Sequence, residues 1–287
     1  MTSQLVYLNG KYLPLNEAKI SVLDRGFIFG DGIYEVIPVF GSKSLRFEHH
    51  MQRLQNSLDA VRITNPLSNT QWQVIIDKLI AATGPQDQYI YLHITRGVAS
   101  RDHRFPDNSE PTVFVMSNIL HPVDPELLKN GISAVTLDDI RWQHCNIKAI
   151  ALLPNILLRQ QAVDRDAVEA ILIRDGNMTE GAASNVFIVD DGIIKTPPKD
   201  NKLLPGITRD LVVELAHTHK MPIEEVSISE KEFLAADEIW LTSSTKEILP
   251  VTRINEQQVG NGKPGVVWQD MYQKYQDYKE ILRKQSN

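Results

Sequence analysis

The sequence predicts a mixed α/β protein with two domains. Its 287 residues are enough for two domains of ordinary size, each with its own core. Patterns of strand period and of helical period follow one another along the whole chain. The segment NILHPVDPE contains two prolines and divides the chain. We therefore expect domains at residues 1–118 and 126–287, with a linker at 119–125.

Composition excludes several classes of protein. Hydrophobic residues make up 42% and charged residues 23%, as in soluble globular proteins. The net charge of -6 argues against nucleic-acid binding. No apolar run reaches the ~18 residues of a membrane helix, and the N-terminal sequence lacks the pattern of a signal peptide. Cys145 is the only cysteine, so no internal disulfide is possible. These features favour a cytoplasmic protein.

Local patterns predict most elements. Asn9-Gly10 favours a type I′ turn, so residues 4–8 and 11–14 are expected to form a β-hairpin. Three glycines in RGFIFGDG predict a loop. Further strands are expected at 33–40, 88–95, 111–118, 131–137, 167–174, 185–189 and 238–241. Helices are expected at 48–61, 70–82 and 155–163, after Gly206, and around Trp268.

Lys148 is the first candidate for chemistry. It lies in an apolar setting, between Ile147 and the run AIALL. The ordinary interpretation is a lysine at a strand end with its ammonium group in solvent. The alternative is a reactive amine, since burial disfavours the charged form and a neutral amine attacks aldehydes. This stretch alone favours the ordinary interpretation.

Two further features are suited to a flat, phosphorylated ligand. Glu180 precedes Gly181, Ala182 and Ala183, whose small side chains let a ring approach the backbone. A helix that begins after Gly206 offers free N–H groups to a phosphate. The ordinary interpretations are a surface acid in a turn and a helix start that binds nothing.

Other polar groups have two interpretations each. Arg53 lies off the apolar stripe of its helix and is either solvated or an anion contact. Thr242-Ser243-Ser244-Thr245 is either a capped turn or a set of phosphate donors. The basic loop (residues 96–110) is either solvated or a carboxylate receptor. Its cationic side chains are Arg96, Arg101, His103 and Arg104.

The lysine, the acid, the helix start and the hydroxyl cluster fit one ligand. Pyridoxal phosphate needs an amine for its aldehyde, an acid for its pyridine nitrogen and donors for its phosphate. The motifs DRGFIFGDGIYE, HMQRL, TRGVASRDHRFP, DDIRWQHCNIKAI, TEGAASNVF, GITRD and LTSSTKEI together resemble the class IV pyridoxal-phosphate transaminases, above all the D-amino-acid aminotransferases. The resemblance covers nearly the whole chain and implies fold type IV, with two α/β domains and the cofactor at their interface.

The resemblance also implies roles for the cofactor-binding residues. Lys148 matches the lysine that binds the aldehyde covalently and moves the α-proton. Glu180 matches the acid that keeps the pyridine nitrogen protonated, and Arg53 matches a phosphate ligand. The other cofactor-binding positions that it implies are Ser184, Asn185, Leu204, Ile207, Thr208 and Ser244.

The substrate-binding residues implied by the resemblance are Tyr34, Arg101 and His103, which trap the α-carboxylate in D-specific members. In that family the arginine and histidine come from the partner subunit, so a homodimer is expected. The sequence departs from the family at Ser100, where a proline is common, which puts the substrate range in doubt. Arg104 could favour acidic substrates or be merely solvated.

We therefore expect a ping-pong transaminase that moves an amino group from a D-amino acid to a 2-oxo acid. The same motifs also serve branched-chain L-aminotransferases, R-selective amine transaminases and aminodeoxychorismate lyases. A catalytically silent protein that binds the cofactor is the alternative from another class. No metal is expected, and we interpret six other histidines as structural or surface residues: His49, His50, His121, His144, His217 and His219.

Overall fold

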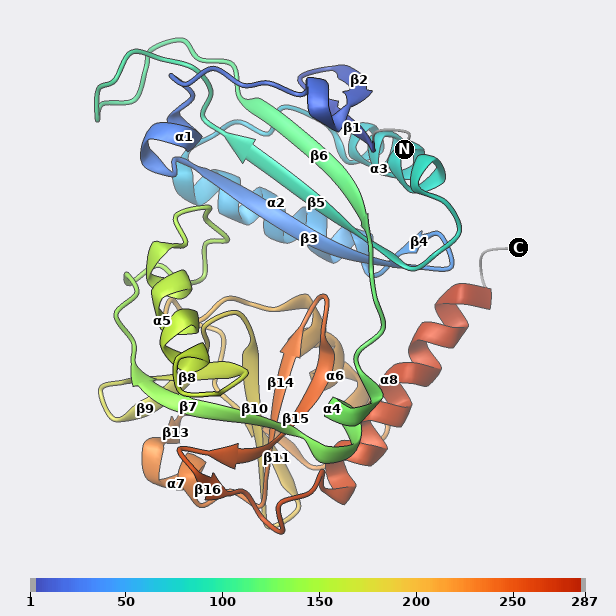
Figure 1. Cartoon of the computed structure of the whole chain (residues 1–287), viewed down its shortest axis with the longest axis vertical. Coiled ribbons are helices and arrows are strands. Elements are labelled where there is room, and N and C mark those ends of the chain that lie inside the picture. The colour runs from blue at the N-terminus through green and yellow to red at the C-terminus, as the bar shows by residue number, and fades with distance from the viewer. Residues whose placement is uncertain (1–3, 285–287) are drawn as a thin grey trace. The chain divides into compact units, whose positions relative to one another are not determined.

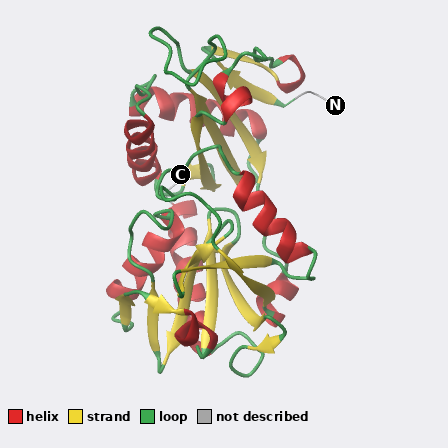
Figure 2. Cartoon of the chain, turned by 90° about the vertical axis from the view of Figure 1, so that its left-hand side faces the viewer, coloured by secondary structure: helices red, strands yellow, loops and turns green. Residues whose placement is uncertain are grey.

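The computed structural model describes residues 4–284, which form two compact units (Figures 1 and 2). Unit 1 comprises residues up to His121, Ile147–Ala151 and the chain from Ile281 onward; unit 2 comprises Pro122–Asn146 and Leu152–Glu280. Two segments from the second half of the chain thus belong to unit 1, whereas the sequence analysis predicted two domains that follow one another along the chain. Residues 1–3 of the first expected domain and residues 285–287 of the second lie outside the described residues.

Unit 1 is built on an antiparallel sheet of six strands, in the order β2-β1-β6-β5-β3-β4. The strands are β1 Leu5–Leu8, β2 Lys11–Pro14, β3 Gly32–Phe40, β4 Lys43–Ser44, β5 Gln88–Thr95 and β6 Thr112–Ile119. Asn9 and Gly10 have φ angles of 46° and 86°, as the predicted hairpin turn requires.

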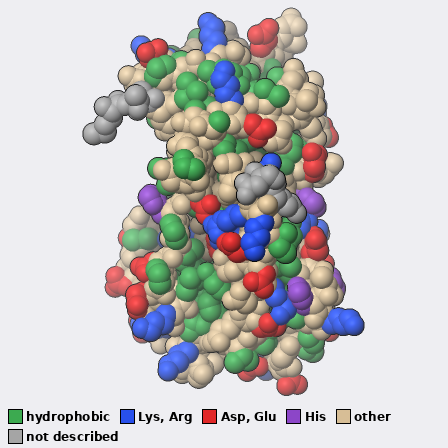
Figure 3. Space-filling view, turned by 90° about the vertical axis from the view of Figure 1, so that its right-hand side faces the viewer, with side chains coloured by type: hydrophobic (Ala, Val, Ile, Leu, Met, Phe, Trp, Pro, Cys, Tyr) green, Lys and Arg blue, Asp and Glu red, His purple; other side chains and the backbone are tan. Residues whose placement is uncertain are grey.

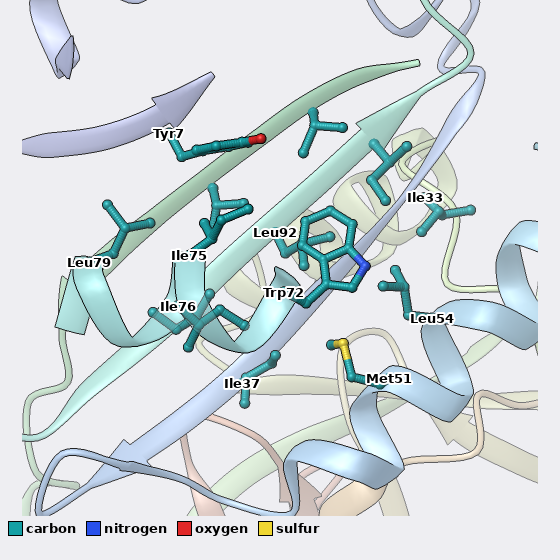
Figure 4. Packing of buried hydrophobic residues seen from close by; sticks show 14 of the residues in the cluster. Tyr7, Ile33, Ile37, Met51, Leu54, Trp72, Ile75, Ile76, Leu79 and Leu92 are labelled. Carbon is teal, nitrogen blue, oxygen red and sulfur yellow. The ribbon is translucent and has the colours of Figure 1, made fainter. Parts of the chain in front are cut away.

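Two helices, α2 (Phe47–Val61) and α3 (Asn69–Thr83), pack on this sheet (Figure 1). The capping box of Ser68 and Gln71 fixes the start of α3. Apolar side chains of both helices meet those of β3 and β5 around Trp72, which is fully buried (Figure 4). A short 3-10 helix, η1, spans Leu15–Glu17.

The expected glycine loop was wrong, because Arg25–Phe29 forms the short helix α1. The Asp24 side chain accepts a hydrogen bond from the Gly26 N–H group (2.8 Å) and caps the helix start. Gly30 has φ 65° and ends the helix in the left-handed conformation. Five residues are too few to show a helical period, so the sequence pattern could not reveal α1.

Unit 2 is built on a mixed sheet of ten strands, in the order β12-β11-β10-β14-β15-β7-β8-β9-β13, with β16 paired to β15. The strands are β7 Ile132–Asp138, β8 Glu169–Arg174, β9 Asn177–Gly181, β10 Asn185–Asp190, β11 Ile193–Thr196, β12 Ile223–Glu225, β13 Ile228–Ser229, β14 Glu238–Ser243, β15 Glu247–Ile254 and β16 Gln257–Gln258. The helices are α4 Pro125–Asn130, α5 Leu153–Val163, α6 Ile207–Thr218, α7 Glu230–Leu234 and α8 Val266–Lys284, of which the part from Ile281 belongs to unit 1. The sequence analysis expected β7, β8, β10, β14, α5, α6 and α8, but not β9, which carries Glu180, nor the short elements α4, α7, β12, β13 and β16.

Among residues 4–284, no helix is both long and apolar enough to cross a membrane. Acidic and basic side chains are interspersed over the face in Figure 3. In the described part of the chain, no group of three His, Cys, Asp or Glu side chains could hold a metal ion.

Candidate active site

Lys148 lies on an extended segment that pairs with the start of β3. Tyr34 donates its N–H to the Lys148 carbonyl (3.0 Å), and Ile33 and Ala149 form an antiparallel bridge. The Lys148 N–H donates to the Ser57 hydroxyl on α2 (3.2 Å). The Lys148 Nζ is 4.0 Å from the centroid of the Tyr34 ring. The lysine is therefore fixed by its backbone, with its half-buried amine over an aromatic ring.

Arg53, the predicted phosphate ligand, is held by a buried carboxylate on β3. Its Nε donates to Glu35 Oε1 (2.8 Å) and its Nη2 to Glu35 Oε2 (2.7 Å). His50 Nδ1 contacts the same Oε2 at 2.8 Å. The Glu35 and His50 side chains are fully buried. The Glu35 carboxylate thus sets the plane in which the Arg53 guanidinium lies.

The charges of this cluster follow from its contacts. Burial by itself raises the pKa of Glu35, but the Arg53 guanidinium and His50 hold that pKa well below its ordinary value. Burial lowers the pKa of His50, although Glu35 opposes the change. A neutral His50 donates from Nδ1 to Glu35, and its buried Nε2 then has no hydrogen-bond partner among the described residues.

The structure separates the three predicted carboxylate-binding residues into two groups. Arg101 and His103 are exposed on the basic loop, with the Arg101 Cζ 5.5 Å and the His103 ring 5.3 Å from the centroid of the Phe29 ring. Tyr34, within the described residues, contacts Lys148 and Tyr91 instead. Among the described residues, no ring or cation–π contact joins Tyr34 to Arg101 or His103 within one chain.

In unit 2, Glu180 lies on β9 and is buried at the centre of a polar cluster. Its Oε2 accepts hydrogen bonds from the Leu204 N–H (3.1 Å) and from Asn185 Nδ2 (3.2 Å). Asn185 Nδ2 also donates to the Leu204 carbonyl (2.8 Å). Three predicted cofactor-binding residues are thus in direct contact.

Arg141 is a member of this cluster that the sequence analysis missed. Its Nη1 forms an ion pair with Glu180 Oε1, and its other edge is bidentate to Asp139 (2.9 and 2.9 Å). Burial raises the pKa of Glu180 to about 7, and Arg141 opposes this rise. Arg141 stands in the motif DDIRWQHC, where nothing in its spacing distinguishes it from a surface arginine.

The start of α6 is joined to the same cluster. Gly206 is the N-cap residue, and no side chain caps the helix there. A Cβ at Gly206 would lie 2.0 Å from Asn185 Oδ1, so a larger residue would displace the Asn185 side chain. Ile207 and Thr208, the first helical residues, are buried. The uncapped N–H groups and the helix dipole at this position are suited to a phosphate.

The predicted hydroxyl groups differ in their partners. The Ser184 hydroxyl donates to Glu169 Oε2 (3.1 Å). Ser244 lies in the turn after β14 and is half-buried. Thr242 is paired with Asn185 across the β10–β14 ladder, and its buried Oγ1 has no hydrogen-bond partner among the residues described. A buried hydroxyl of this kind is costly unless a ligand satisfies it.

Both units hold groups that fit pyridoxal phosphate. Unit 1 presents the amine of Lys148, which makes no ion pair with a described residue, and the guanidinium of Arg53, which Glu35 orients. Unit 2 presents a buried carboxyl group, an uncapped helix start and the unsatisfied hydroxyl of Thr242. These are the donor and acceptor types that the aldehyde, the ring nitrogen and the phosphate require.

Comparison with known proteins gives the class. Residues 32–254 match the family model of amino-transferase class IV. The chain belongs to this family of pyridoxal-phosphate-dependent enzymes, and it is therefore an aminotransferase that uses pyridoxal phosphate.

Curated relatives match almost the full length of the chain. A D-alanine aminotransferase of Bacillus licheniformis is 37% identical over 91% of this chain and 92% of its own length. A D-alanine aminotransferase of Staphylococcus haemolyticus is 36% identical over 96% of this chain and 98% of its own.

Solved structures share the fold type IV architecture. A branched-chain amino acid aminotransferase of Escherichia coli superposes with a TM-score of 0.91 at 26% identity, over 96% of this chain and 94% of its own. A fold IV transaminase from Curtobacterium pusillum superposes with a TM-score of 0.80 at 24% identity, over 92% of each chain. The predicted fold class is confirmed.

Proposed function

We propose that this enzyme transfers the amino group of a D-amino acid to a 2-oxo acid in a ping-pong cycle, of the type D-alanine plus 2-oxoglutarate. The observation that carries the proposal is the placement of Arg101 and His103. Both stand on the exposed basic loop, and both side chains lie beside the ring of Phe29 on α1. Such a pair offers several N–H donors to a carboxylate. The likeness to the D-alanine aminotransferases supports the same assignment.

We propose that residues of both units bind the cofactor. Pyridoxal phosphate, when bound, supplies an aldehyde for the amino group and a ring that accepts electrons as the Cα–H bond breaks. Glu180 holds the ring nitrogen, while Arg53, Ser244 and the helix start at Ile207 and Thr208 hold the phosphate. The other residues that we assign to the cofactor site are Ser184, Asn185 and Leu204.

Lys148 is the proposed catalytic base. Its Nζ removes the proton from the substrate's Cα, as general-base catalysis requires a positioned amine within reach of that proton. Its backbone bonds to Tyr34 and Ser57 fix the position from which the side chain moves. Tyr34, beside the amine, contacts the substrate carboxylate together with Arg101 and His103.

A homodimer completes the proposed site, with Arg101 and His103 supplied by the second copy. Both side chains are exposed, and neither contacts Tyr34 among the described residues. Helix α5 also exposes an apolar stripe at the spacing i, i+3, i+4, formed by Leu153, Ile156 and Leu157. Exposed stripes of this kind are typical of contacts between subunits. We propose that the dimer acts in the cytoplasm.

Two observations support other members of the class as the second candidate. The superposition on a branched-chain amino acid aminotransferase is close. Ser100 replaces the proline common before the arginine, so the basic loop has more backbone freedom. A branched-chain L-aminotransferase or an R-selective amine transaminase would use the same cofactor groups.

The test is a half-reaction screen. The loaded enzyme is mixed with D- and L-alanine, D- and L-glutamate, D- and L-leucine and an R-amine, and the loss of the cofactor's absorbance is followed. Loss with the D-amino acids alone supports the proposal. Loss with L-leucine alone would replace it by the branched-chain alternative, and no loss with any donor would indicate a silent protein. Arg104→Ala tests the acidic preference, because an unchanged ratio of D-glutamate to D-alanine kcat/KM would exclude it.

A further inference from the structure

Helix α1 contacts the backbone of the basic loop through Arg25. The Arg25 side chain is buried, and its Nη1 donates to the Asp102 carbonyl (2.6 Å) and to the Arg104 carbonyl (3.4 Å). Its Nε is fixed by Asp31 Oδ2 (2.8 Å). Asp102 is the residue between Arg101 and His103. A buried, oriented guanidinium thus fixes the backbone from which both carboxylate-binding side chains project.

The same helix contacts those two side chains through Phe29. The guanidinium carbon of Arg101 lies 5.5 Å from the centroid of the Phe29 ring, within cation–π distance. The His103 ring lies 5.3 Å from it, tilted by 36°. Arg101 and His103 are exposed and have long or rotatable side chains, so without a support they would sample several rotamers.

The base of the loop is fixed independently of Phe29. Asp31 binds Arg96 through both oxygens (2.8 and 2.9 Å). The Phe105 ring lies 3.7 Å from the Arg96 guanidinium carbon and 4.6 Å from that of Arg62. The Phe29 ring also lies 4.9 Å from the Arg25 guanidinium carbon, but the hydrogen bonds of Arg25 to Asp31 and to the loop carbonyls do not involve the ring. Loss of Phe29 would therefore free the two side chains and leave the course of the loop intact.

We infer that Phe29 is a positioning residue for substrate binding: its ring orients Arg101 and His103 so that both donate to one carboxylate. This inference rests on the proposed function, in which these two residues bind the substrate's α-carboxylate. Phe29 increases the affinity for the carboxylate by orienting the two side chains, whereas Arg25 fixes the loop backbone that carries them.

The experiment compares Phe29→Leu, Phe29→Tyr and Phe27→Leu in the loaded enzyme. Phe27 is the matched control, since it lies on the same helix, is 70% exposed and, among the described residues, makes no ring or cation–π contact with Arg101 or His103. The readouts are KM and kcat for D-alanine and the competitive inhibition constant of propanoate. Propanoate carries the carboxylate without an amine, so its binding reports the carboxylate contact alone.

Phe29→Leu should raise the propanoate inhibition constant and the KM for D-alanine about tenfold, because a small misplacement of donors weakens binding. The kcat should stay within about twofold of wild type. Phe29→Tyr keeps the ring and should restore wild-type values, which Phe27→Leu should also show. A lower kcat with an unchanged inhibition constant, or no change in either, would overturn the inference.

Arg101→Ala separates this inference from the function on which it rests. If Arg101→Ala raises the propanoate inhibition constant and Phe29→Leu does not, the inference about Phe29 is wrong and the proposed function stands. If Arg101→Ala leaves the constant unchanged, the loop does not bind the carboxylate, and both are wrong.

Discussion

Glu35 is fully buried on β3 and remains charged, since both of its oxygens are bonded to Arg53 and one also to His50. Glu35→Gln would leave the buried Arg53 guanidinium without its counter-ion. We expect the free energy of unfolding at pH 7 to fall by about 3 kcal/mol, the usual cost of removing one partner of a buried pair. Urea denaturation measures the change. Glu48→Gln, at an exposed position of α2, should change it by less than about 0.5 kcal/mol.

The pH dependence of this effect has a definite sign. The pKa of Glu35 is lowered in the folded protein, so its stabilisation is complete above the unfolded pKa of about 4.3 and decreases as the pH falls below that value. The unfolding free energy is compared with and without Glu35→Gln, in both cases in a His50→Gln background, so that no histidine titrates at the cluster. A difference in unfolding free energy that grew on acidification would contradict the assignment of a lowered pKa.

Arg141 should influence cofactor affinity through Glu180. Because Arg141 opposes the rise of the Glu180 pKa, Arg141→Met should raise that pKa above about 7 and leave the carboxyl group neutral at pH 7. A neutral Glu180 attracts a protonated ring nitrogen less than a carboxylate does. Since a pKa shift of one unit corresponds to about a tenfold change in affinity, we expect the Kd of pyridoxal phosphate to rise about tenfold. Titration of the cofactor-free protein measures it.

Arg174→Met is the control for Arg141. Arg174 binds Asp139 (2.9 Å) in the same cluster, but it forms no ion pair with Glu180 among the described residues. The Arg174 variant should bind the cofactor within about threefold of wild type. The loss caused by Arg141→Met should also diminish once the pH rises above the raised pKa of Glu180, because the carboxyl group then ionises without Arg141. Equal losses in both variants would mean that the cluster acts only through folding.

Lys148→Ala tests the proposed base directly. Loss of a general base typically lowers the rate by 10²–10⁴, and we expect kcat to fall by at least about 10³. Cofactor binding should remain measurable by absorbance. A variant that retained a tenth of the activity would exclude Lys148 as the base.

Sequence and structure agree unevenly at single residues. Lys148 and Glu180 were singled out by their local setting, an amine in an apolar run and an acid before small residues, but each stretch alone favoured the ordinary interpretation. Their predicted roles came from the combination of signals and from the family resemblance. Glu35 was missed because it stands in the apolar strand DGIYEVIPVF, and its role depends on Arg53, 18 positions away. Arg141 was missed for the same reason, since its partner Glu180 is 39 positions away. Such pairs are products of tertiary structure and leave no local pattern.

At the scale of elements, α6 and β10 are coupled by the contact of Gly206 with Asn185. Gly206→Ala would place a Cβ 2.0 Å from Asn185 Oδ1, while its φ of -69° is ordinary for alanine. We therefore expect a loss of about 1–3 kcal/mol from overpacking alone, measured by urea denaturation. In an Asn185→Ala background the same substitution should cost much less, as a double-mutant cycle will show. Additive losses would contradict the contact.

The elements themselves were predicted where a period or a turn signal was long enough. The β1–β2 hairpin followed from Asn9-Gly10, and α2 from its stripe of Met51, Leu54 and Leu58. The elements that were missed are short or stabilised by distant contacts. Helix α1 is the main case, because its cap Asp24 also accepts a hydrogen bond from Thr112, on β6 (2.6 Å).

At the scale of the whole molecule, the proposed dimer predicts complementation between two inactive variants. Lys148→Ala and Arg101→Ala are unfolded together and refolded as a mixture. If Arg101 serves the partner's site, each heterodimer has one intact site, and random pairing should restore about a quarter of the wild-type activity, since half of the molecules are heterodimers. Each variant refolded alone is the control. No recovery above the controls would place both residues in one subunit's site.

The bridge between Ile33 and Ala149 also has a consequence for synthesis on the ribosome. Within the described residues, β3 pairs along one edge with β5, and its other edge has β4 only at Val39 and Phe40. At Ile33 that second edge is covered by Ala149. The nascent chain must therefore grow by more than 100 residues before this part of β3 acquires its neighbour. Until then it presents unpaired N–H and C=O groups, which are prone to join a strand of another chain.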